Sequence, residues 1–174
     1  ALLERERTIS LIVLEKRTGR LQWQQEIATV EQSIVEDAFR RMAGATPIVG
    51  GDIAICPTGS GGVVAIDLTL RSLLWAYRYP RCEQSLSLMT FGYVPVLEQE
   101  SRWLDGTPVI AGARVILTPP ESDQIHCLDL LTGKLLWSRE RGDDLYVACA
   151  EEEQVVLVGK SCVTALDGSR GREQ

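Results

Sequence analysis

The chain has 174 residues, of which 45% are hydrophobic and 24% are charged, with a net charge of −6 at pH 7. This length can bury a sizeable core. The acidic balance argues against a nucleic-acid surface, which needs a basic patch, and no apolar run approaches the roughly 20 residues of a membrane span.

Residues 1–28 are predicted to form the first repeat unit. Charges at residues 4–7 leave no signal peptide, and the chain begins and ends within a repeat, so we expect a piece of a longer protein. An apolar run at residues 11–14 and a segment ending at Trp23 flank a Thr18-Gly19 turn. This pattern predicts a β-hairpin, because glycine adopts a positive φ at little steric cost.

Residues 29–44 break the strand pattern. Thr29 suits the start of a helix and Gly44 its end. Between them, apolar side chains recur at helical spacing among charged ones: Val30, Ile34, Val35, Ala38, Phe39 and Met42. We predict a short helix or loop insertion near residues 30–43, packed on the fold between two sheets; a partner-binding helix is the alternative.

Residues 45–80 form the most complete repeat unit. We interpret the glycine-rich residues 58–62 as a loop, because a phosphate-binding motif would need G-x-G-x-x-G spacing and a following helix. Asp67 stands eight positions before Trp75 in the hairpin that follows. Arg71 occupies the position that holds glycine in the other hairpins, so this turn must differ or be strained.

Residues 81–105 are a long connection with possible strands at residues 85–89 and 91–97. Trp103 lies outside the repeat register. We expect it to cover a sheet edge; lining of a pocket is the alternative.

Residues 106–141 repeat the preceding unit without a gap up to the tryptophan. Asp129 again stands eight positions before Trp137, and Thr132-Gly133 supplies the turn. The single histidine, His126, lies in the inner strand, where its alternating position could face a channel, and we find no second His or Cys ligand nearby. We expect a structural histidine; a metal ligand or catalytic base is the alternative.

Residues 144–174 begin a fourth unit that stops before its tryptophan position. The acids at residues 143–144 and 151–153 do not follow the calcium-loop pattern, so we interpret them as solvated turns.

The units share the pattern Ala-x-Asp-x-x-Thr-Gly-x-x-x-Trp. This pattern resembles the tryptophan-docking motif of the bacterial pyrroloquinoline-quinone-like (PQQ-like) β-propeller repeat family, over most of the chain. The resemblance implies four-stranded antiparallel blades in which each tryptophan packs against the adjacent blade. Departures are Val13 and Cys127 for alanine and Glu15 for aspartate. The docking residues that it assigns are Trp23, Trp75, Trp137, Asp67, Asp129, Asp167, Gly19, Gly133, Gly171, Ala65 and Ala165.

The predicted fold is all-β: a partial β-propeller of about three to four blades of four-stranded antiparallel sheets. We expect a single sector of a larger ring over residues 1–174. Its repeat units are expected at approximately residues 1–28, 45–80, 106–141 and 144–174.

The five cysteines form no C-x-x-C pair and suit no zinc site: Cys56, Cys82, Cys127, Cys149 and Cys162. We expect structural thiols, with one disulfide or a reactive thiol as alternatives. The family's quinone-dependent alcohol dehydrogenases carry a disulfide between adjacent cysteines, and this chain has no adjacent pair.

No base is paired with a nucleophile in this sequence, so we predict no catalytic residue, metal site or cofactor. The first hypothesis is therefore a non-catalytic scaffold with protein partners, besides the remaining blades of the same propeller. The motif itself does not decide this, because both scaffolds and quinone-dependent dehydrogenases of the family carry it. The resemblance implies an extracytoplasmic location in the periplasm or cell envelope. The alternatives are part of a dehydrogenase that uses PQQ and Ca²⁺, and a sensor that binds a small ligand in the central channel.

Overall fold

Four antiparallel β-sheets follow one another along the chain in the computed structural model, which describes residues 1–37, 40–41, 44–82 and 103–174. The first sheet is β1 (Leu2–Arg5), β2 (Thr8–Leu14) and β3 (Leu21–Thr29). The second is β4 (Ile48–Gly50), β5 (Ile53–Pro57), β6 (Gly62–Asp67) and β7 (Ser72–Arg78). The third is β8 (Val109–Ala111), β9 (Arg114–Leu117), β10 (Gln124–Asp129) and β11 (Leu135–Glu140). The fourth is β12 (Asp144–Ala150), β13 (Gln154–Gly159) and β14 (Val163–Asp167).

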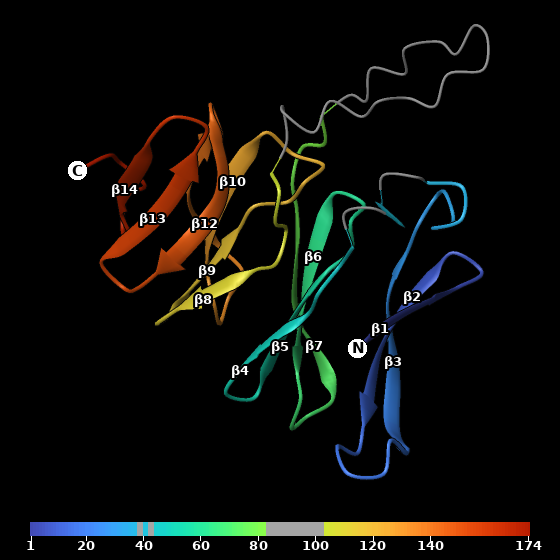
Figure 1. Ribbon diagram of the computed structural model, residues 1–174. Helices are drawn as coiled ribbons and strands as arrows, with labels where there is room; N and C mark the ends of the chain where they lie inside the picture. The colour runs from blue at the N-terminus through green and yellow to red at the C-terminus, as the bar shows by residue number, and fades with distance from the viewer. Residues whose placement is uncertain (38–39, 42–43, 83–102) are drawn as a thin grey trace, which may run out of the picture.

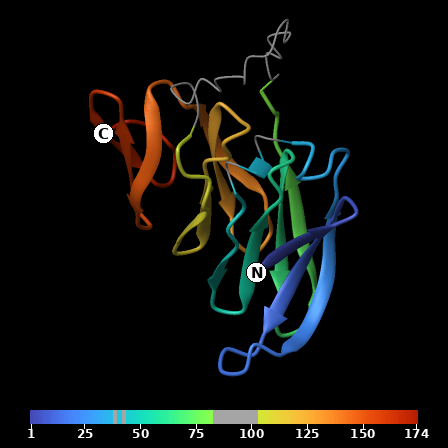
Figure 2. The ribbon, with the colours of Figure 1, turned by 45° about the vertical axis from the view of Figure 1, so that its right-hand side comes forward.

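The sheets stand side by side in chain order, so the first and the fourth sheet lie at opposite sides of the molecule (Figures 1 and 2). Each sheet is an antiparallel meander of three or four strands, and sequence neighbours pair within it. Strand β8 of the third sheet lies beside β12 of the fourth. This arrangement confirms the predicted all-β fold, a partial propeller.

The core is divided among the three interfaces between neighbouring sheets. The second and third sheets each bury apolar residues on both faces, because successive side chains of a strand point to opposite faces. The interface between the first two sheets centres on Leu11, Ala54 and Ile66. The next centres on Ile55, Ala65, Val115 and Leu128, and the last on Ile116, Ile125, Val155 and Leu166.

A β-bulge recurs in the last hairpin of the first three sheets. The pairing register shifts between Val13 and Leu14, between Ala65 and Ile66, and between Cys127 and Leu128. In each case one extra residue lies in the outer strand immediately before the tryptophan. Because a bulge bends and twists its strand, it turns the side chain that follows.

The connection between the first and second sheets is held by a buried ion pair. Arg40 is 7% exposed, and its guanidinium lies 2.5 Å from the carboxylate of Glu4 in β1. The same guanidinium donates to the carbonyl of Gln32, and Glu4 accepts the backbone N–H of Ile34. The connection is thereby fixed to the first sheet.

Several predictions for the connections fall partly or wholly outside the described residues. Of the helix predicted near residues 30–43, Arg40 and Arg41 are helical, residues 34–36 form a turn, and residues 30–33 and 37 are not helical. Residues 38–39 and 42–43 lie outside the described residues. The strands predicted at residues 85–89 and 91–97 lie outside the described residues. Trp103 is buried in the core between the third and fourth sheets.

Candidate functional site

The indole of Trp75 joins the second sheet to the third. Its Nε1–H donates to the carbonyl of Leu130 at 2.9 Å, and the ring packs against Gly133. A Cβ at Gly133 would lie 2.5 Å from the Trp75 ring, so a side chain there would displace the indole. Gly133 also has a φ of +69°, which favours glycine.

Trp137 repeats this arrangement between the third and fourth sheets. Its Nε1–H donates to the carbonyl of Gly168 at 3.0 Å, and its ring covers Gly171, whose φ is +68°. Trp75 and Trp137 are 7% and 8% exposed, so both rings are buried between sheets.

The turn that receives each indole is held by its own aspartate. Asp129 accepts hydrogen bonds from the Thr132 hydroxyl and backbone N–H, and Asp167 from Ser169 and the N–H of Arg170. These hydrogen bonds lower the pKa of both aspartates, and the bonds donated by the hydroxyl groups have the largest effect. Asp67 accepts the N–H groups of Thr69 and Leu70 in the same way. The acids of the motif therefore shape turns.

The small residue of the motif lies directly opposite the tryptophan on the neighbouring strand. Ala65 pairs with Trp75, Cys127 with Trp137, and Val13 with Trp23. Directly opposite side chains share one face of a sheet, so a small residue leaves room for the indole. Ala165 pairs with Val156 in the fourth sheet.

The interface between the first and second sheets departs from this pattern. Arg71 replaces glycine in the receiving turn and still has a φ of 55°, so the turn is strained and does not change its form. Its guanidinium lies 6.0 Å from the ring centroid of Trp23, which is half-buried. The Trp23 N–H has no acceptor among the described residues. Gly19 has the same left-handed φ of +70°.

The free energy of unfolding of Arg71→Gly is expected to be about 1 kcal/mol higher than that of Arg71→Ala. Both variants lose the guanidinium over Trp23, and glycine alone escapes the left-handed strain. Urea unfolding of the two variants measures the difference. Equal stability would mean that the φ of 55° costs nothing.

A second cluster, which the sequence did not reveal, lies between the second and third sheets at the opposite end of the strands. Tyr79 donates to the carboxylate of Glu121 at 2.7 Å, and Glu121 also accepts the N–H of Gly61. The His126 ring lies 5.4 Å from that of Tyr79, and its Nδ1 is 3.3 Å from the Tyr77 hydroxyl. The spacing of two between Tyr77, near the end of β7, and Tyr79, just after it, is the one sequence signal that places both rings on one side.

His126 is 1% exposed, and its Nε2 has no hydrogen-bond partner among the described residues. Burial lowers the pKa of His126 to about 4. Burial likewise raises the pKa of the Tyr79 hydroxyl, with the Glu121 carboxylate as the second cause. The histidine is therefore neutral at neutral pH and enclosed by aromatic rings.

The depressed pKa of His126 makes stability depend on pH. On acidification, the histidine of the unfolded chain takes up a proton near pH 6.5 and that of the folded chain only near pH 4. The free energy of unfolding is therefore highest above pH 6.5 and decreases as the pH falls from 6.5 to 4. Between pH 7 and pH 4.5, we expect the free energy of unfolding to fall by about 2 kcal/mol less in His126→Phe than in the parent chain. Urea unfolding at both pH values tests this, and equal losses would contradict it.

The described residues offer no fit for a metal ion, because they bring no three His, Cys, Asp or Glu side chains together. Within the same residues, Cys56, Cys127, Cys149 and Cys162 form no disulfide. Burial raises the pKa of the Cys56 and Cys127 thiols to about 12, so both are unreactive. The absence of a bound cofactor such as PQQ remains a prediction.

Residues 3–94 match the family of the outer membrane protein assembly factor BamB. No curated protein matches the chain. Among solved structures, BamB from Moraxella catarrhalis is similar with a TM-score of 0.58 at 17% identity, over 99% of this chain and 46% of BamB. The quinohemoprotein alcohol dehydrogenase ADHIIG from Pseudomonas putida HK5 is similar with a TM-score of 0.57 at 12% identity, over 99% of this chain and 33% of the enzyme.

At these identities the solved structures establish the fold alone, a partial propeller. The chain spans about half the length of BamB and a third of the dehydrogenase.

Proposed function

Because this chain belongs to the PQQ-like β-propeller repeat family, through its match to the family of BamB, we propose that it is a non-catalytic propeller sector. It serves as a protein-interaction scaffold within a larger chain. The support for this proposal comes from the aspartates that recur in the repeats. Asp67, Asp129 and Asp167 are hydrogen-bonded within their own turns, so none of them is placed to act on a substrate.

In this proposal the tryptophans are docking residues that hold neighbouring blades in one orientation. The geometry of Trp75 and Trp137 supports the role, since each indole both packs and donates a hydrogen bond across an interface. Rigid placement of successive sheets is what a scaffold needs, because a partner then meets loops in fixed positions. The remaining blades of the same propeller are the nearest partners of this sector.

The proposed location is outside the cytoplasm. The support is the family's description, which names an outer membrane protein assembly factor. Among the described residues, no helix is long and apolar enough to cross a membrane. The proposed partners are therefore proteins of the cell envelope.

Affinity purification of the full-length protein from the envelope fraction tests the scaffold role. We expect a protein partner in stoichiometric amount, recovered equally with His126→Phe, since that ring is buried away from any partner. An envelope preparation that yields the folded protein alone, or a protein recovered only from the cytoplasm, would contradict the proposal.

A further inference from the structure

We propose that one end of the sheets carries a docking surface for an anionic lipid bilayer. The surface consists of the outer turns, which join the last two strands of the first three sheets at residues 15–20, 67–71 and 129–134. The fourth sheet has the corresponding turn at residues 167–172. This inference goes beyond the scaffold role and does not depend on it.

Exposed leucines recur at the outer turns of the second and third sheets. Leu70 and Leu131, within these turns, are 74% and 64% exposed. Two more exposed leucines precede the tryptophan on each outer strand: Leu73, Leu74, Leu135 and Leu136. The second and third sheets already have a neighbouring sheet on each face, so a further sheet of the propeller would not cover these six side chains.

The outer turns form one row, because each lies against the outer strand of the sheet before it. Trp75 donates to Leu130 in the outer turn of the third sheet, and Trp137 donates to Gly168 in that of the fourth. Arg71, in the outer turn of the second sheet, lies over the tryptophan ring on the outer strand of the first. The exposed leucines therefore lie along a single edge of the molecule.

The row of outer turns is basic although the chain is acidic. The four turns contain seven Lys or Arg and four acids, a net charge of +3, against −6 for the whole chain. Three of the acids accept N–H groups of their own turns. Among the described residues, no ion pair involves any of the seven cations: Lys16, Arg17, Arg20, Arg71, Lys134, Arg170 and Arg172.

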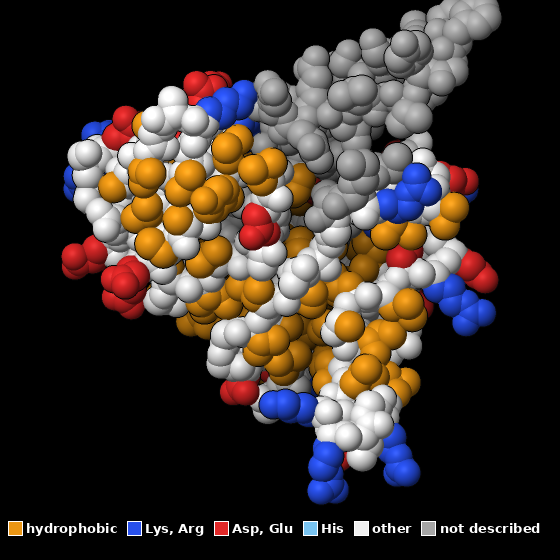
Figure 3. Space-filling model, viewed as in Figure 1, with side chains coloured by type: hydrophobic (Ala, Val, Ile, Leu, Met, Phe, Trp, Pro, Cys, Tyr) orange, Lys and Arg blue, Asp and Glu red, His pale blue; other side chains and the backbone are white. Residues whose placement is uncertain are grey.

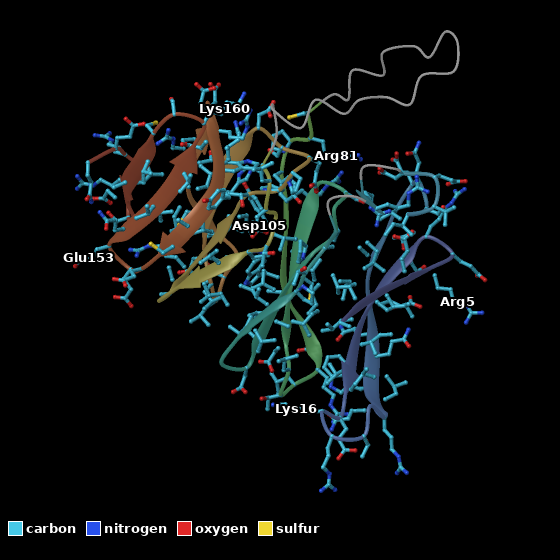
Figure 4. All side chains as sticks on the ribbon, in the orientation of Figure 1. Arg5, Lys16, Arg81, Asp105, Glu153 and Lys160 are labelled. Carbon is cyan, nitrogen blue, oxygen red and sulfur yellow. The ribbon has the colours of Figure 1, made fainter. Side chains whose placement is uncertain are left out.

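The basic side chains project from one end of the molecule. Lys16 marks this end on the first sheet in Figure 4, whereas Arg81 and Lys160 mark the opposite end. Basic side chains also form the lower tip of the space-filling view, below the first sheet (Figure 3).

Acidic side chains at the same end lie at the other edge of the sheets. Asp52 is in the β4–β5 turn, and three glutamates, residues 151–153, are in or beside the β12–β13 turn. Strands β4 and β12 are the edge strands farthest from the outer strands of their sheets. Charge is thus separated across this end, and only its outer row matches an anionic surface.

Leucine beside lysine or arginine is the combination that binds the surface of an anionic bilayer. Apolar side chains enter the boundary between headgroups and acyl chains, and each cation near the surface strengthens binding by about fivefold at moderate salt. Here both kinds of side chain stand on projecting turns of successive sheets. This arrangement fits an extended, laterally continuous surface.

Co-sedimentation of the full-length protein with lipid vesicles tests the proposal. The probe is a vesicle of phosphatidylglycerol and phosphatidylcholine in equal parts, and a vesicle of phosphatidylcholine alone is the reference. We expect the protein to bind the anionic vesicles at least about tenfold more tightly than the neutral ones. Binding is expected to weaken as the salt concentration rises, because salt screens the cations.

Two pairs of substitutions at the row are expected to weaken binding to the anionic vesicles by about tenfold each: Leu70→Ser with Leu131→Ser, and Lys16→Glu with Arg17→Glu. All four side chains are exposed, so the variants keep the fold, which circular dichroism checks. Leu104→Ser and Lys160→Glu are the matched controls. Both side chains are exposed at the opposite end of the sheets, and we expect no change in binding.

Equal binding to neutral and anionic vesicles, or binding that survives in both pairs of variants, would overturn the proposal. Absence of vesicle binding would also overturn it. If Leu70→Ser with Leu131→Ser then lost the envelope partner on affinity purification, the row would be a protein-binding surface. Vesicle binding by a protein that recovers no partner would support the bilayer proposal and remove only the scaffold role.

Discussion

Replacing Trp75 or Trp137 by alanine is expected to lower the free energy of unfolding by about 3 to 5 kcal/mol. Each ring is at least nine-tenths buried between two sheets, so truncation removes one of the largest side chains of its interface. It also leaves the carbonyl of Leu130 or Gly168 without its indole donor. Urea unfolding followed by circular dichroism measures the loss.

Trp23→Ala is the internal control for this experiment. The Trp23 ring is half-buried and faces a guanidinium, and its N–H has no acceptor among the described residues, so we expect about half the loss. Trp75→Phe separates packing from hydrogen bonding and is expected to cost about 1 to 2 kcal/mol. A loss below about 1 kcal/mol for both Trp75→Ala and Trp137→Ala would remove the docking role.

Arg40→Met is expected to destabilise the chain by about 3 to 5 kcal/mol, because it leaves the Glu4 carboxylate buried without its cation. Glu4→Leu should cost a similar amount, since it leaves the guanidinium unpaired. The double variant is expected to lose clearly less than the two single losses together, because neither charge then stays buried alone.

Arg41→Met is the matched control for this cycle. Arg41 is the exposed neighbour of Arg40, and its guanidinium donates to the carbonyl of Val35 at 3.0 Å. We expect a loss below about 0.5 kcal/mol there. Additive losses in the Glu4 and Arg40 cycle would show that the two side chains do not interact in solution.

The fold could be predicted from the sequence because its strongest signals are local. An acid, a turn glycine and a tryptophan at fixed spacing, as in Asp129, Gly133 and Trp137, mark one hairpin each, and their repetition implies stacked sheets. Turn chemistry also supplied the reason for glycine, since Gly19, Gly133 and Gly171 all have left-handed backbones.

Contacts between repeats could not be predicted from the sequence. Spacing left open whether the Arg71 turn would change or be strained, and the structure decides for strain. Both turns have a left-handed backbone, since the φ values of Gly133 and Arg71 are both positive, so backbone conformation alone does not make Gly133→Val more damaging than Arg71→Val. The ring of Trp75 over Gly133 is the difference that remains.

Two buried pairs of polar side chains could not be predicted from the sequence for the same reason. Glu4 and Arg40 come together across the first connection, and Tyr79 meets Glu121 across two sheets. No periodicity within a strand or helix relates such partners, because their proximity depends on how whole sheets pack. His126, by contrast, was expected to be structural from its lack of neighbouring ligands, and it lies enclosed by Tyr77 and Tyr79.

Calorimetric titration of PQQ into the full-length protein, with Ca²⁺ present, tests most directly whether this propeller is non-catalytic. We expect no saturable heat from a sample that circular dichroism shows to be folded. Saturable binding at about micromolar affinity or tighter, in a one-to-one ratio, would contradict it and establish a cofactor-binding propeller.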